Sequence, residues 1–574
     1  MAETETGMDS IAPAGGDVDL RPPGRFLSVL GRHPLPFLAL LCVALWLPGI
    51  LSLPALDRDE SRFAQASRQM LESGNFVDIR LGQVPRYKKP VGIYWLQAAT
   101  TAAASPFVGT GKIWTYRLAS LLGGVLAAWM TFWCARAVTG PEASFLAGAL
   151  MAGTLLLTAE ATIATTDAVL LACTTAMQGV ILRTYLAARS GARGPSMVLV
   201  LAGWAALALG ILVKGPVAPG LAAVTLIPLC LWDRQVRWLS RFRPLWGGPV
   251  LLVIVLPWLL AIAMASHGAF FEQSLGNDFA AKIAGGQESH GALPGYFLML
   301  SAVAFWPAIL FVAPGLANAV PRHREPAIRF LLVWAAGWWL LVEMVPTKLP
   351  HYVISAYPAL AILAAIWVMR RQWTFWERIA AWISSVQFLV GAAALAAALA
   401  ILPRLYGPGD LWWLWAIAAC GALLALAALG LFATGRRLGA VLLSLGAALV
   451  LLPGLAAGVG PRLDRLWVTT RLAAQTMQDK RSGDPPPVLA GYQEPSMLFA
   501  LGADLALSDG AGAAEMAARD GGLALIEARE KGAFLARLAE KEADATPLQT
   551  VTGFNYSRGR PVAVTIYRVA AVGH

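Results

Sequence analysis

Acidic, basic and aromatic residues crowd the loop between the first two hydrophobic segments of this chain. Asp59 and Glu60 follow the first segment directly, Arg62 comes shortly after them, and the run 87–90 reads Tyr-Lys-Lys-Pro. Charges this dense beside a bilayer must be hydrated, paired or bound to something charged. A carboxylate can manage a proton, and ammonium groups can hold a phosphate. The loop therefore predicts transfer of a group off a lipid phosphate at the membrane surface.

The two neighbouring acids are expected to have different roles. Adjacent residues on a helix point in different directions, so one substrate atom cannot face both side chains. We expect Asp59 to be the general base or the carboxylate that orients the substrate. We assign Glu60, Arg62 and Tyr87 to substrate binding. The alternative is that the acids form only a solvated turn or a helix cap.

The lysine pair offers a phosphate site. At about 4 Å and an effective dielectric of about 20, one lysine–phosphate charge pair contributes roughly 4 kcal/mol before desolvation. Lys89 is therefore expected to hold a phosphate leaving group. The alternative is that both lysines only reach towards the membrane interface, next to the aromatic residues Tyr94 and Trp95.

Asp167 opens the fourth hydrophobic segment, directly after two threonines. Ionisable groups inside membrane segments are costly and usually functional. We expect Asp167 to assist catalysis, with an exposed helix cap as the alternative.

Two further loops carry polar clusters. The loop 267–293 is rich in glycine, and a short loop follows Pro346. With six histidines in the chain and no paired spacing, the sequence does not support a metal site, and we assign no metal ligand and no cofactor; a divalent metal stays an open alternative. We assign the loop residues to phosphate binding (Lys282, Lys348) and to substrate binding (His290, His351, Tyr352).

Composition places these loops on a membrane protein. The chain has 574 residues, of which 57% are hydrophobic and only 14% charged, whereas soluble proteins carry about 25% charged residues. A spanning helix needs roughly 20 mostly apolar residues. The sequence predicts thirteen such segments: 36–54, 114–137, 143–160, 166–187, 197–213, 216–232, 246–266, 294–316, 328–345, 351–369, 379–402, 411–433 and 437–458.

The net charge of +11 does not indicate a nucleic-acid partner. The arginines gather in every second short loop, which is the positive-inside bias that orients membrane helices. This bias puts the N-terminus in the cytoplasm, and an odd number of spans puts the C-terminus outside. All the polar clusters described above then face the external side, which predicts one composite site there.

Three domains are expected. Residues 1–33 are rich in Gly, Pro and Asp and predict a disordered cytoplasmic tail. Residues 34–460 form the transmembrane catalytic domain, and its first external loop, 57–112, has helical periodicity at Phe63, Ala66 and Met70. Residues 461–574 are expected to form a small soluble α/β domain outside the membrane, because the stretch 488–574 alternates short apolar runs with helical patterns.

Read in order, these motifs are similar to those of glycosyltransferase family 39. The chain resembles the bacterial branch of this family of protein O-mannosyltransferase-like enzymes, with the lipid A aminoarabinose transferases as the most similar characterised group. The resemblance covers about residues 35–370. The motifs that carry it are Asp59-Glu60-Ser61-Arg62-Phe63, Lys89-Pro90, Tyr94-Trp95, Thr166-Asp167-Ala168, Lys214-Gly215, Pro257-Trp258 and Lys348-Leu349-Pro350-His351-Tyr352.

The resemblance implies the GT-C fold and a sugar donor linked to polyprenyl phosphate. It implies that Asp59 is the main catalytic residue, that Asp167 assists, and that Lys89 holds the carrier phosphate. The implied acceptor is lipid A or lipopolysaccharide, another glycan or a protein, at the periplasmic face of a bacterial inner membrane. The aminoarabinose transferases have an acid that helps to hold a metal where this chain has Lys88, so the metal is not carried over.

Two other classes of function stay open from the sequence alone. A transporter or flippase of lipid-linked sugars also has many spans and charges within the membrane. Such proteins often show repeated halves and binding charges near the bilayer midplane, and the sequence shows neither. The other class is a non-catalytic partner of a membrane enzyme.

Overall fold

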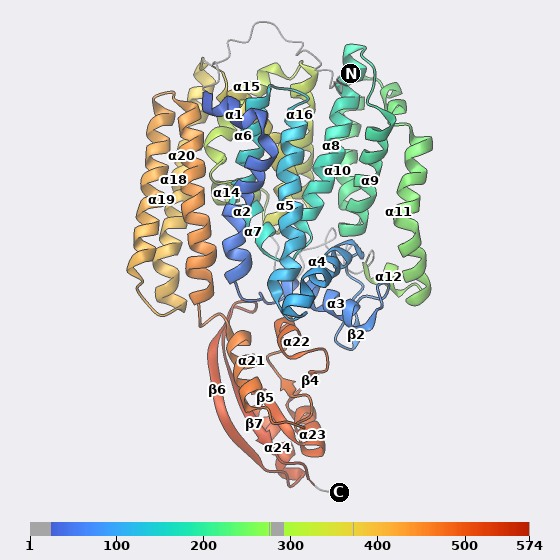
Figure 1. Cartoon of the computed structure of the whole chain (residues 1–574), viewed down its shortest axis with the longest axis vertical. Coiled ribbons are helices and arrows are strands. Elements are labelled where there is room, and N and C mark those ends of the chain that lie inside the picture. The colour runs from blue at the N-terminus through green and yellow to red at the C-terminus, as the bar shows by residue number, and fades with distance from the viewer. Residues whose placement is uncertain (1–24, 275, 277–291, 371, 573–574) are drawn as a thin grey trace, which may run out of the picture.

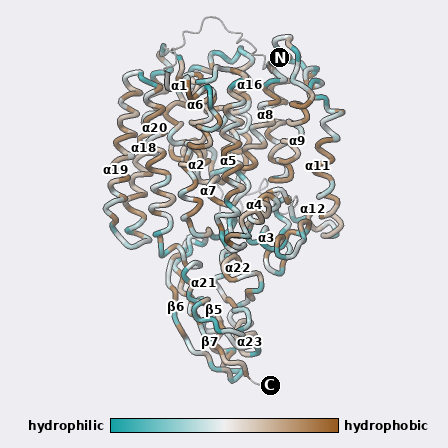
Figure 2. The backbone as a smooth tube through the Cα atoms, viewed as in Figure 1, coloured by the Kyte–Doolittle hydropathy of each residue, from teal (hydrophilic) through white to brown (hydrophobic). Residues whose placement is uncertain are grey.

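The computed structural model describes residues 25–274, 276, 292–370 and 372–572. These residues form a bundle of long apolar helices and a small α/β domain that extends from one end of it (Figure 1). Figure 2 shows hydrophobic residues along the bundle helices and a more hydrophilic mixture in the small domain. The expected division between membrane helices and a small C-terminal α/β domain is confirmed.

In the described part of the chain, ten helices are long and apolar enough to cross a membrane, and one bent helix pair makes an eleventh. The pair consists of α6 (Pro141–Ala152) and α7 (Leu155–Thr162). The ten spans are α2 (Pro34–Ser52), α5 (Ile113–Ala135), α8 (Asp167–Ser190), α9 (Met197–Lys214), α11 (Pro244–Ala265), α16 (Pro326–Met344), η4 with α17 (Pro350–Val368), α18 (Phe375–Tyr406), α19 (Trp412–Ala433) and α20 with the turns that follow it (Arg437–Arg462).

Three of the thirteen expected segments differ from straight spans. The segment 143–160 bends by 62° between α6 and α7, where the Thr154 side chain caps the new helix. The segment 216–232 forms α10 (Val217–Asp233), which has 17 residues. The segment 294–316 divides into α14 (Tyr296–Ala304) and α15 (Ile309–Ala319). Pro307 stands in that break, and proline interrupts helices because it lacks a backbone donor.

The helices differ in how deeply they lie in the bundle. Of the most apolar 18-residue stretch in each helix, 83% is buried in η4–α17 and 78% in α8, but only 17% in α11. In Figure 1, α11 and α19 lie at opposite edges of the bundle. Helices α8 and α17 therefore form its core, and α11 presents apolar side chains to the lipid.

The first long loop folds into short helices, as its periodicity predicted. Helix α3 (Asp59–Ser73) buries Phe63, Ala66 and Met70. The small hairpin of β1 (Arg80–Leu81) and β2 (Val84–Pro85) follows, and then α4 (Gly92–Val108). Figure 1 places α3 and α4 at the end of the bundle that carries the α/β domain.

The C-terminal domain is built on a five-stranded sheet in the order β4-β3-β5-β7-β6. Strands β3, β4 and β5 are parallel, and β7 runs antiparallel to β5 and to β6. The strands are β3 (Val488–Ala490), β4 (Ala506–Ser508), β5 (Gly522–Glu527), β6 (Ala545–Asn555) and β7 (Arg560–Val569).

Helices cover both faces of this sheet. One hydrophobic cluster joins the sheet to α21 (Val468–Asp479) and α22 (Pro495–Leu501). A second cluster joins it to α23 (Gly510–Asp520) and α24 (Lys531–Glu540). Figure 1 shows α22 at the end of the domain that faces the bundle, next to α3.

Candidate active site

Two of the predicted site acids stand at helix N-termini. Asp59 is the first residue of α3 and Asp167 is the first residue of α8. The partial positive charge of a helix N-terminus favours a carboxylate there. His351 belongs to η4 (Pro350–Ala356), at the start of the most buried span. The charges of Asp167, Lys214, Asp59 and Lys89 act on the His351 ring, so residues from five separate parts of the sequence form one charged cluster.

Asp167 pairs with Lys214, the last residue before a tight turn at the end of α9. Lys214 Nζ lies 2.6 Å from Asp167 Oδ1, and Thr166 Oγ1 donates to Asp167 Oδ2 at 2.9 Å. Lys214 ends α9, and Gly215 after it has φ +62°. Glycine adopts this left-handed conformation at little cost, so α9 can end at Lys214. Both charges are largely buried, so the pair holds α8 and α9 together at the site.

Glu160 is a site residue that the sequence motifs did not include. Its Oε1 lies 3.7 Å from His351 Nδ1, and Thr165 Oγ1 donates to its Oε2 at 2.9 Å. The residue lies on α7 and is buried. A carboxylate inside the hydrophobic segment 143–160 was the signal that could have identified it.

Asp59 combines an accessible side chain with strong positive surroundings. Its side chain is 63% exposed, and Arg62 Nη1 lies 3.3 Å from its Oδ1. The surrounding protein keeps some water from the Asp59 carboxyl, which by itself would raise its pKa, but the guanidinium groups of Arg86 and Arg62 outweigh that effect, so the pKa lies below its ordinary value. Arg86, which the motifs also missed, is buried against the Phe63 ring.

A cavity of about 280 Å³ adjoins this cluster. Three ammonium side chains reach it from two elements, the stretch before α4 and the end of α9. Its other walls are mostly apolar. The lining residues are Lys88, Lys89, Pro90, Ile211, Lys214, Gly215, Pro216, Pro219, Leu259, Phe270, Phe271 and Ser274. This combination of ammonium groups and apolar surface fits a molecule with an anionic head and a hydrocarbon chain.

Tyr352 and Tyr87 border the same region in different ways. Lys214 Nζ lies 5.8 Å from the centre of the Tyr352 ring, and the His351 ring is 5.0 Å from that ring. The Tyr87 hydroxyl donates to Asp78 Oδ1 at 2.8 Å, and its ring meets Phe270 edge-on. Tyr352 therefore lies within the charged cluster, whereas Tyr87 shapes the wall formed by Phe270.

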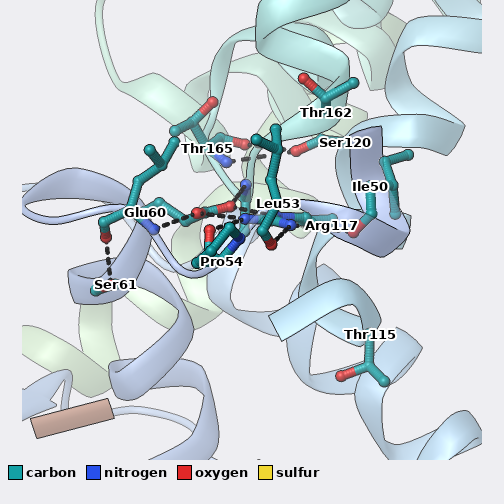
Figure 3. A network of polar contacts seen from close by, with 12 residues as sticks. Ile50, Leu53, Pro54, Glu60, Ser61, Thr115, Arg117, Ser120, Thr162 and Thr165 are labelled. Atoms are coloured by element: carbon teal, nitrogen blue, oxygen red, sulfur yellow. Dashed lines mark hydrogen bonds and ion pairs between the residues drawn. The ribbon is translucent and has the colours of Figure 1, made fainter. Parts of the chain in front are cut away.

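Glu60 lies in a buried network instead of the cavity (Figure 3). Arg117 Nε and Nη2 lie 2.7 and 2.8 Å from its two carboxylate oxygens. The backbone amides of Leu56 and Ala164 also donate to it, at 2.9 and 2.8 Å. Glu60 thus links the segment before Asp59 to the segment before Asp167. These contacts favour a positioning role, and direct binding of substrate by Glu60 stays a prediction without support from them.

Lys348 is also held by the protein itself. Its Nζ donates to the carbonyls of Glu343 and Val345 at 2.6 and 3.0 Å, at the C-terminal end of α16. A cation at this position complements the helix dipole. The contacts therefore favour a helix-capping role over the expected phosphate site. Lys282 and His290 lie outside the described residues.

The described residues were compared with the arrangements of side chains that hold metal ions. Within residues 25–274, 276, 292–370 and 372–572, no group of three or more His, Cys, Asp or Glu side chains has an arrangement that could hold a metal ion. The prediction that this chain has no resident metal stays a prediction.

Comparison with known protein families reveals one match over the first part of the chain. The family described as dolichyl-phosphate-mannose-protein mannosyltransferase matches residues 40–269. This range contains Asp59, Lys89, Asp167 and Lys214, but it ends before His351.

Curated relatives cover a longer part of the chain. The undecaprenyl phosphate-alpha-4-amino-4-deoxy-L-arabinose arabinosyl transferase 2 of Pseudomonas fluorescens (strain Pf0-1) is 28% identical over 349 residues, which are 59% of this chain and 56% of that protein. A transferase of the same description from Edwardsiella ictaluri (strain 93-146) is 28% identical over 346 residues, 60% of each chain. The matches thus span less than two thirds of these relatives' own length.

Solved structures match nearly the whole chain. ArnT from Cupriavidus metallidurans bound to undecaprenyl phosphate aligns with a TM-score of 0.71 and 20% identity, over 95% of this chain and 98% of that chain. The Archaeoglobus fulgidus oligosaccharyltransferase aligns with a TM-score of 0.52 and 12% identity, over 92% and 70%. The chain therefore has the GT-C fold, and its resemblance to the protein O-mannosyltransferase-like glycosyltransferases is confirmed.

Proposed function

We propose that this protein is a glycosyltransferase that moves a sugar from a polyprenyl-phosphate donor to an acceptor at the external membrane face. The observation that carries the proposal is the charged cluster, in which Asp59, Asp167, Lys89, Lys214 and His351 meet beside a partly apolar cavity. The names of the relatives support the same class of donor. The acceptor is lipid A or lipopolysaccharide, another glycan or a protein.

The donor phosphate belongs on the lysine side of the cluster. Lys89 and Lys88 line the cavity with Lys214, and its apolar wall includes Phe270 and Leu259. Lys214 is paired with Asp167, and we assign the phosphate to Lys89, whose ammonium group can offset the second negative charge that the phosphate gains when it leaves the sugar. The phosphate leaves with the bonding electrons of its glycosidic bond, and positioned cations stabilise the charge that develops on it.

Asp59 acts on the acceptor side of the reaction. Its lowered pKa keeps it ionised at neutral pH, and a carboxylate of low pKa is a weak base. A hydroxyl acceptor would therefore release its proton to Asp59 late, when its oxygen is already bonding to the anomeric carbon. A donor phosphate bound in this charged cluster would offset part of the positive charge around Asp59, and the carboxylate would become a better base once the donor is bound.

Asp167, Lys214, Glu160 and His351 support this arrangement from the bundle core. The Asp167–Lys214 pair fixes the cavity wall, and Glu160 orients the His351 ring through Nδ1. His351 then presents its other ring nitrogen as a hydrogen-bonding group for the sugar or the acceptor. These assignments extend the predicted site by two residues, Glu160 and Lys214.

We place the protein in the bacterial inner membrane, with its N-terminus in the cytoplasm and its C-terminus in the periplasm. The alternation of arginine-rich loops supports this orientation. Helix α1 (Arg25–Arg32) and the C-terminal domain lie at opposite ends of the bundle (Figure 1), which is consistent with it. We keep the catalytic bundle at 34–460 and the periplasmic domain at 461–574. The expectation of a disordered tail over 1–33 was wrong for residues 25–32, which form helix α1, and residues 1–24 lie outside the described part of the chain.

Transport of a lipid-linked sugar is the weaker alternative. Transporters bind their substrates near the bilayer midplane, whereas Asp59 lies on α3 at one end of this bundle (Figure 1). The deciding experiment uses the purified full chain in nanodiscs with a labelled undecaprenyl-phosphate sugar and a lipid A acceptor. Release of undecaprenyl phosphate with a glycosylated product supports the proposal. Donor that crosses liposome membranes without being consumed would support transport.

The sugar and the acceptor can be found in cells. Mass spectrometry of lipid A, core oligosaccharide and envelope glycans from a deletion strain should reveal one missing sugar. Restoring the gene should restore that sugar, and the Asp59→Asn variant should not. A deletion strain with an unchanged set of envelope sugars would contradict the proposed function.

A further inference from the structure

The C-terminal domain contacts the two residues that precede Asp59. Asp57 is buried although it lies in a loop, and its exposed fraction is only 8%. Its backbone amide donates to the Tyr556 hydroxyl oxygen at 2.6 Å. Its carboxylate accepts from Ser496 Oγ and, at 3.5 Å, from Thr469 Oγ1. These three partners come from three separate segments of the C-terminal domain, so the domain holds Asp57 from three directions along its own chain.

Arg58 is held in a conformation that side chains rarely adopt. Its φ is +64°, a region in which residues other than glycine are strained and must be held by their surroundings. Its Nη2 donates to the Ser557 carbonyl, next to Tyr556. The C-terminal domain therefore holds both the backbone of Asp57 and the side chain of Arg58, the residue with the strained backbone angle. Asp59 is the next residue and begins α3, so the conformation of Arg58 sets where the Asp59 carboxylate lies.

A third contact anchors the other side of α3. Phe499 of α22 is buried in a cluster with Ala64, Tyr116 and Ala164 of the bundle. Its ring meets the Tyr116 ring edge-on, and its carbonyl accepts from Arg68 Nη1 at 3.2 Å. Ala64 lies on α3 itself, and Ala164 lies three residues before Asp167. The domain thus touches the supports of both site carboxylates without contacting either of them.

The segments of the C-terminal domain that hold Asp57 are hydrogen-bonded to one another. Glu494, at the start of α22, is buried and accepts from Asn555 Nδ2 at 2.8 Å and from Arg558 Nε at 3.3 Å. This bond network ties the turn that carries Tyr556 and Ser557 to the helix that carries Ser496. The two parts of the domain that hold Asp57 and Arg58 therefore move together.

We propose that the C-terminal domain positions Asp59, and that Asp57 is the positioning residue through which it does so. The proposal rests on the proposed function only where turnover is concerned, because the positioning itself is a property of the resting protein. It predicts that the segment 56–62 loses its conformation when the contacts of Asp57 are removed, even if the C-terminal domain stays folded.

The test compares matched tyrosine variants on the same hairpin. Tyr556→Phe removes the oxygen that accepts from the Asp57 amide. Tyr567→Phe removes a hydroxyl from β7, where the ring packs on Phe534 away from the bundle, and serves as the control. Hydrogen–deuterium exchange of the full chain in nanodiscs reports both segments at once. We expect exchange in 56–62 to become at least tenfold faster in Tyr556→Phe, with β5 and β7 unchanged, and no change in Tyr567→Phe.

Two variants of Asp57 complete the test. Asp57→Asn keeps the shape and an acceptor for Ser496 and should preserve slow exchange, whereas Asp57→Ala should lose it. If exchange in 56–62 is unchanged in both Tyr556→Phe and Asp57→Ala, or if Tyr567→Phe accelerates it equally, the proposal is overturned.

Turnover gives a separate outcome. With the undecaprenyl-phosphate sugar as donor, Tyr556→Phe and Asp57→Ala should lower kcat about tenfold with little change in KM for the donor, and Asp57→Asn should restore it. A fall in kcat with unchanged exchange would contradict positioning. If the unaltered protein transfers no sugar, the proposed function fails, but the exchange result still decides whether the domain positions this segment.

Discussion

Removing the Glu60 carboxylate should destabilise the protein strongly, because Glu60 and Arg117 neutralise each other out of contact with water. Both side chains are at most 1% exposed. Breaking a buried ion pair on one side typically costs 3–5 kcal/mol, because the other charge stays buried without a partner. We therefore expect Glu60→Ala to lower the free energy of unfolding by about 3–5 kcal/mol.

Glu60→Gln should recover little of this loss. Each Glu60 oxygen accepts one bond from Arg117 and one from a backbone amide, of Ala164 or of Leu56. In Gln, one of these oxygens becomes an NH₂ group, which only donates and would face two other donors. The guanidinium of Arg117 would also lose its only charged partner in the network.

Glu377 supplies a matched control. It is another buried glutamate, on α18, and its partners are neutral: Asn318 Nδ2 at 2.7 Å and the Thr374 backbone amide at 3.1 Å. In Glu377→Gln one of these two donors keeps an acceptor and the other loses a hydrogen bond to a charged group, which is worth about 1.5–3 kcal/mol. No buried cation is left without its partner, so Glu377→Gln should cost less than Glu60→Gln.

Unfolding in mixed detergent–SDS micelles, followed by tryptophan fluorescence, measures these differences. Donor binding to the folded variants is measured in parallel. If Glu60→Ala is as stable as the unaltered protein within about 1 kcal/mol and yet fails to bind the donor, Glu60 contacts substrate directly. The positioning role derived from the Arg117 network would then be wrong.

The remaining predictions concern the site, the domain contact and the orientation in the membrane. Asp59→Asn should abolish sugar transfer while the protein still inserts and folds, and near-normal turnover would remove Asp59 from the chemistry. Lys89→Ala should weaken donor affinity or turnover about tenfold to a hundredfold, from the loss of a charged hydrogen bond of roughly 1.5–3 kcal/mol. Lys89→Arg should recover only part of it, and Lys88→Ala should be milder; equal small losses at both lysines would contradict a phosphate site at Lys89. Burial, aided by the nearby Glu494 carboxylate and opposed by hydrogen bonds from Ser496, Thr469 and Tyr556, raises the pKa of Asp57 from 3.8 to about 6. Because the folded protein then holds the proton more tightly than the unfolded chain, stability should fall by up to about 3 kcal/mol as pH rises from about 4 to about 6; unfolding measured against pH should show this fall in the unaltered protein but not in Asp57→Asn. An alkaline phosphatase fused after the C-terminus should be active, and an inactive fusion beside an active cytoplasmic reporter at the same place would reverse the proposed orientation.

The membrane class, most of the spans and the short helices of the first loop could be predicted from the amino-acid sequence. Each of these features depends on residues close together in the chain, such as the length of an apolar run or the spacing of Phe63, Ala66 and Met70 along a helix. The sequence also predicted Asp59, Lys89, Asp167, His351 and Tyr352 as site residues, because charges and polar rings beside apolar segments are conspicuous; the structure brings them near one another, and their roles stay predictions.

The partners of several predicted site residues became visible only in the folded structure. Glu60 stands next to Asp59 in the chain, but it turns into the bundle to meet Arg117, 57 positions away. Lys348 stands close to His351, but it caps α16. Asp59 and Glu60 separate because both lie on α3, and a helix rotates each successive side chain by about 100°. Lys348 lies before η4, in the turn that follows α16, so its side chain can reach back to the end of α16.

Contacts between distant segments could not be predicted from patterns of neighbouring residues. Glu160 joins the site through a bend between two short helices, and Asp57 meets Ser496 across 439 residues of chain. Such pairs depend on how complete elements pack, on the direction in which α22 approaches α3, and on the unusual backbone rotation at Arg58. The sequence carries the residues for these contacts, but their partners are chosen only when the helices and the C-terminal domain assemble.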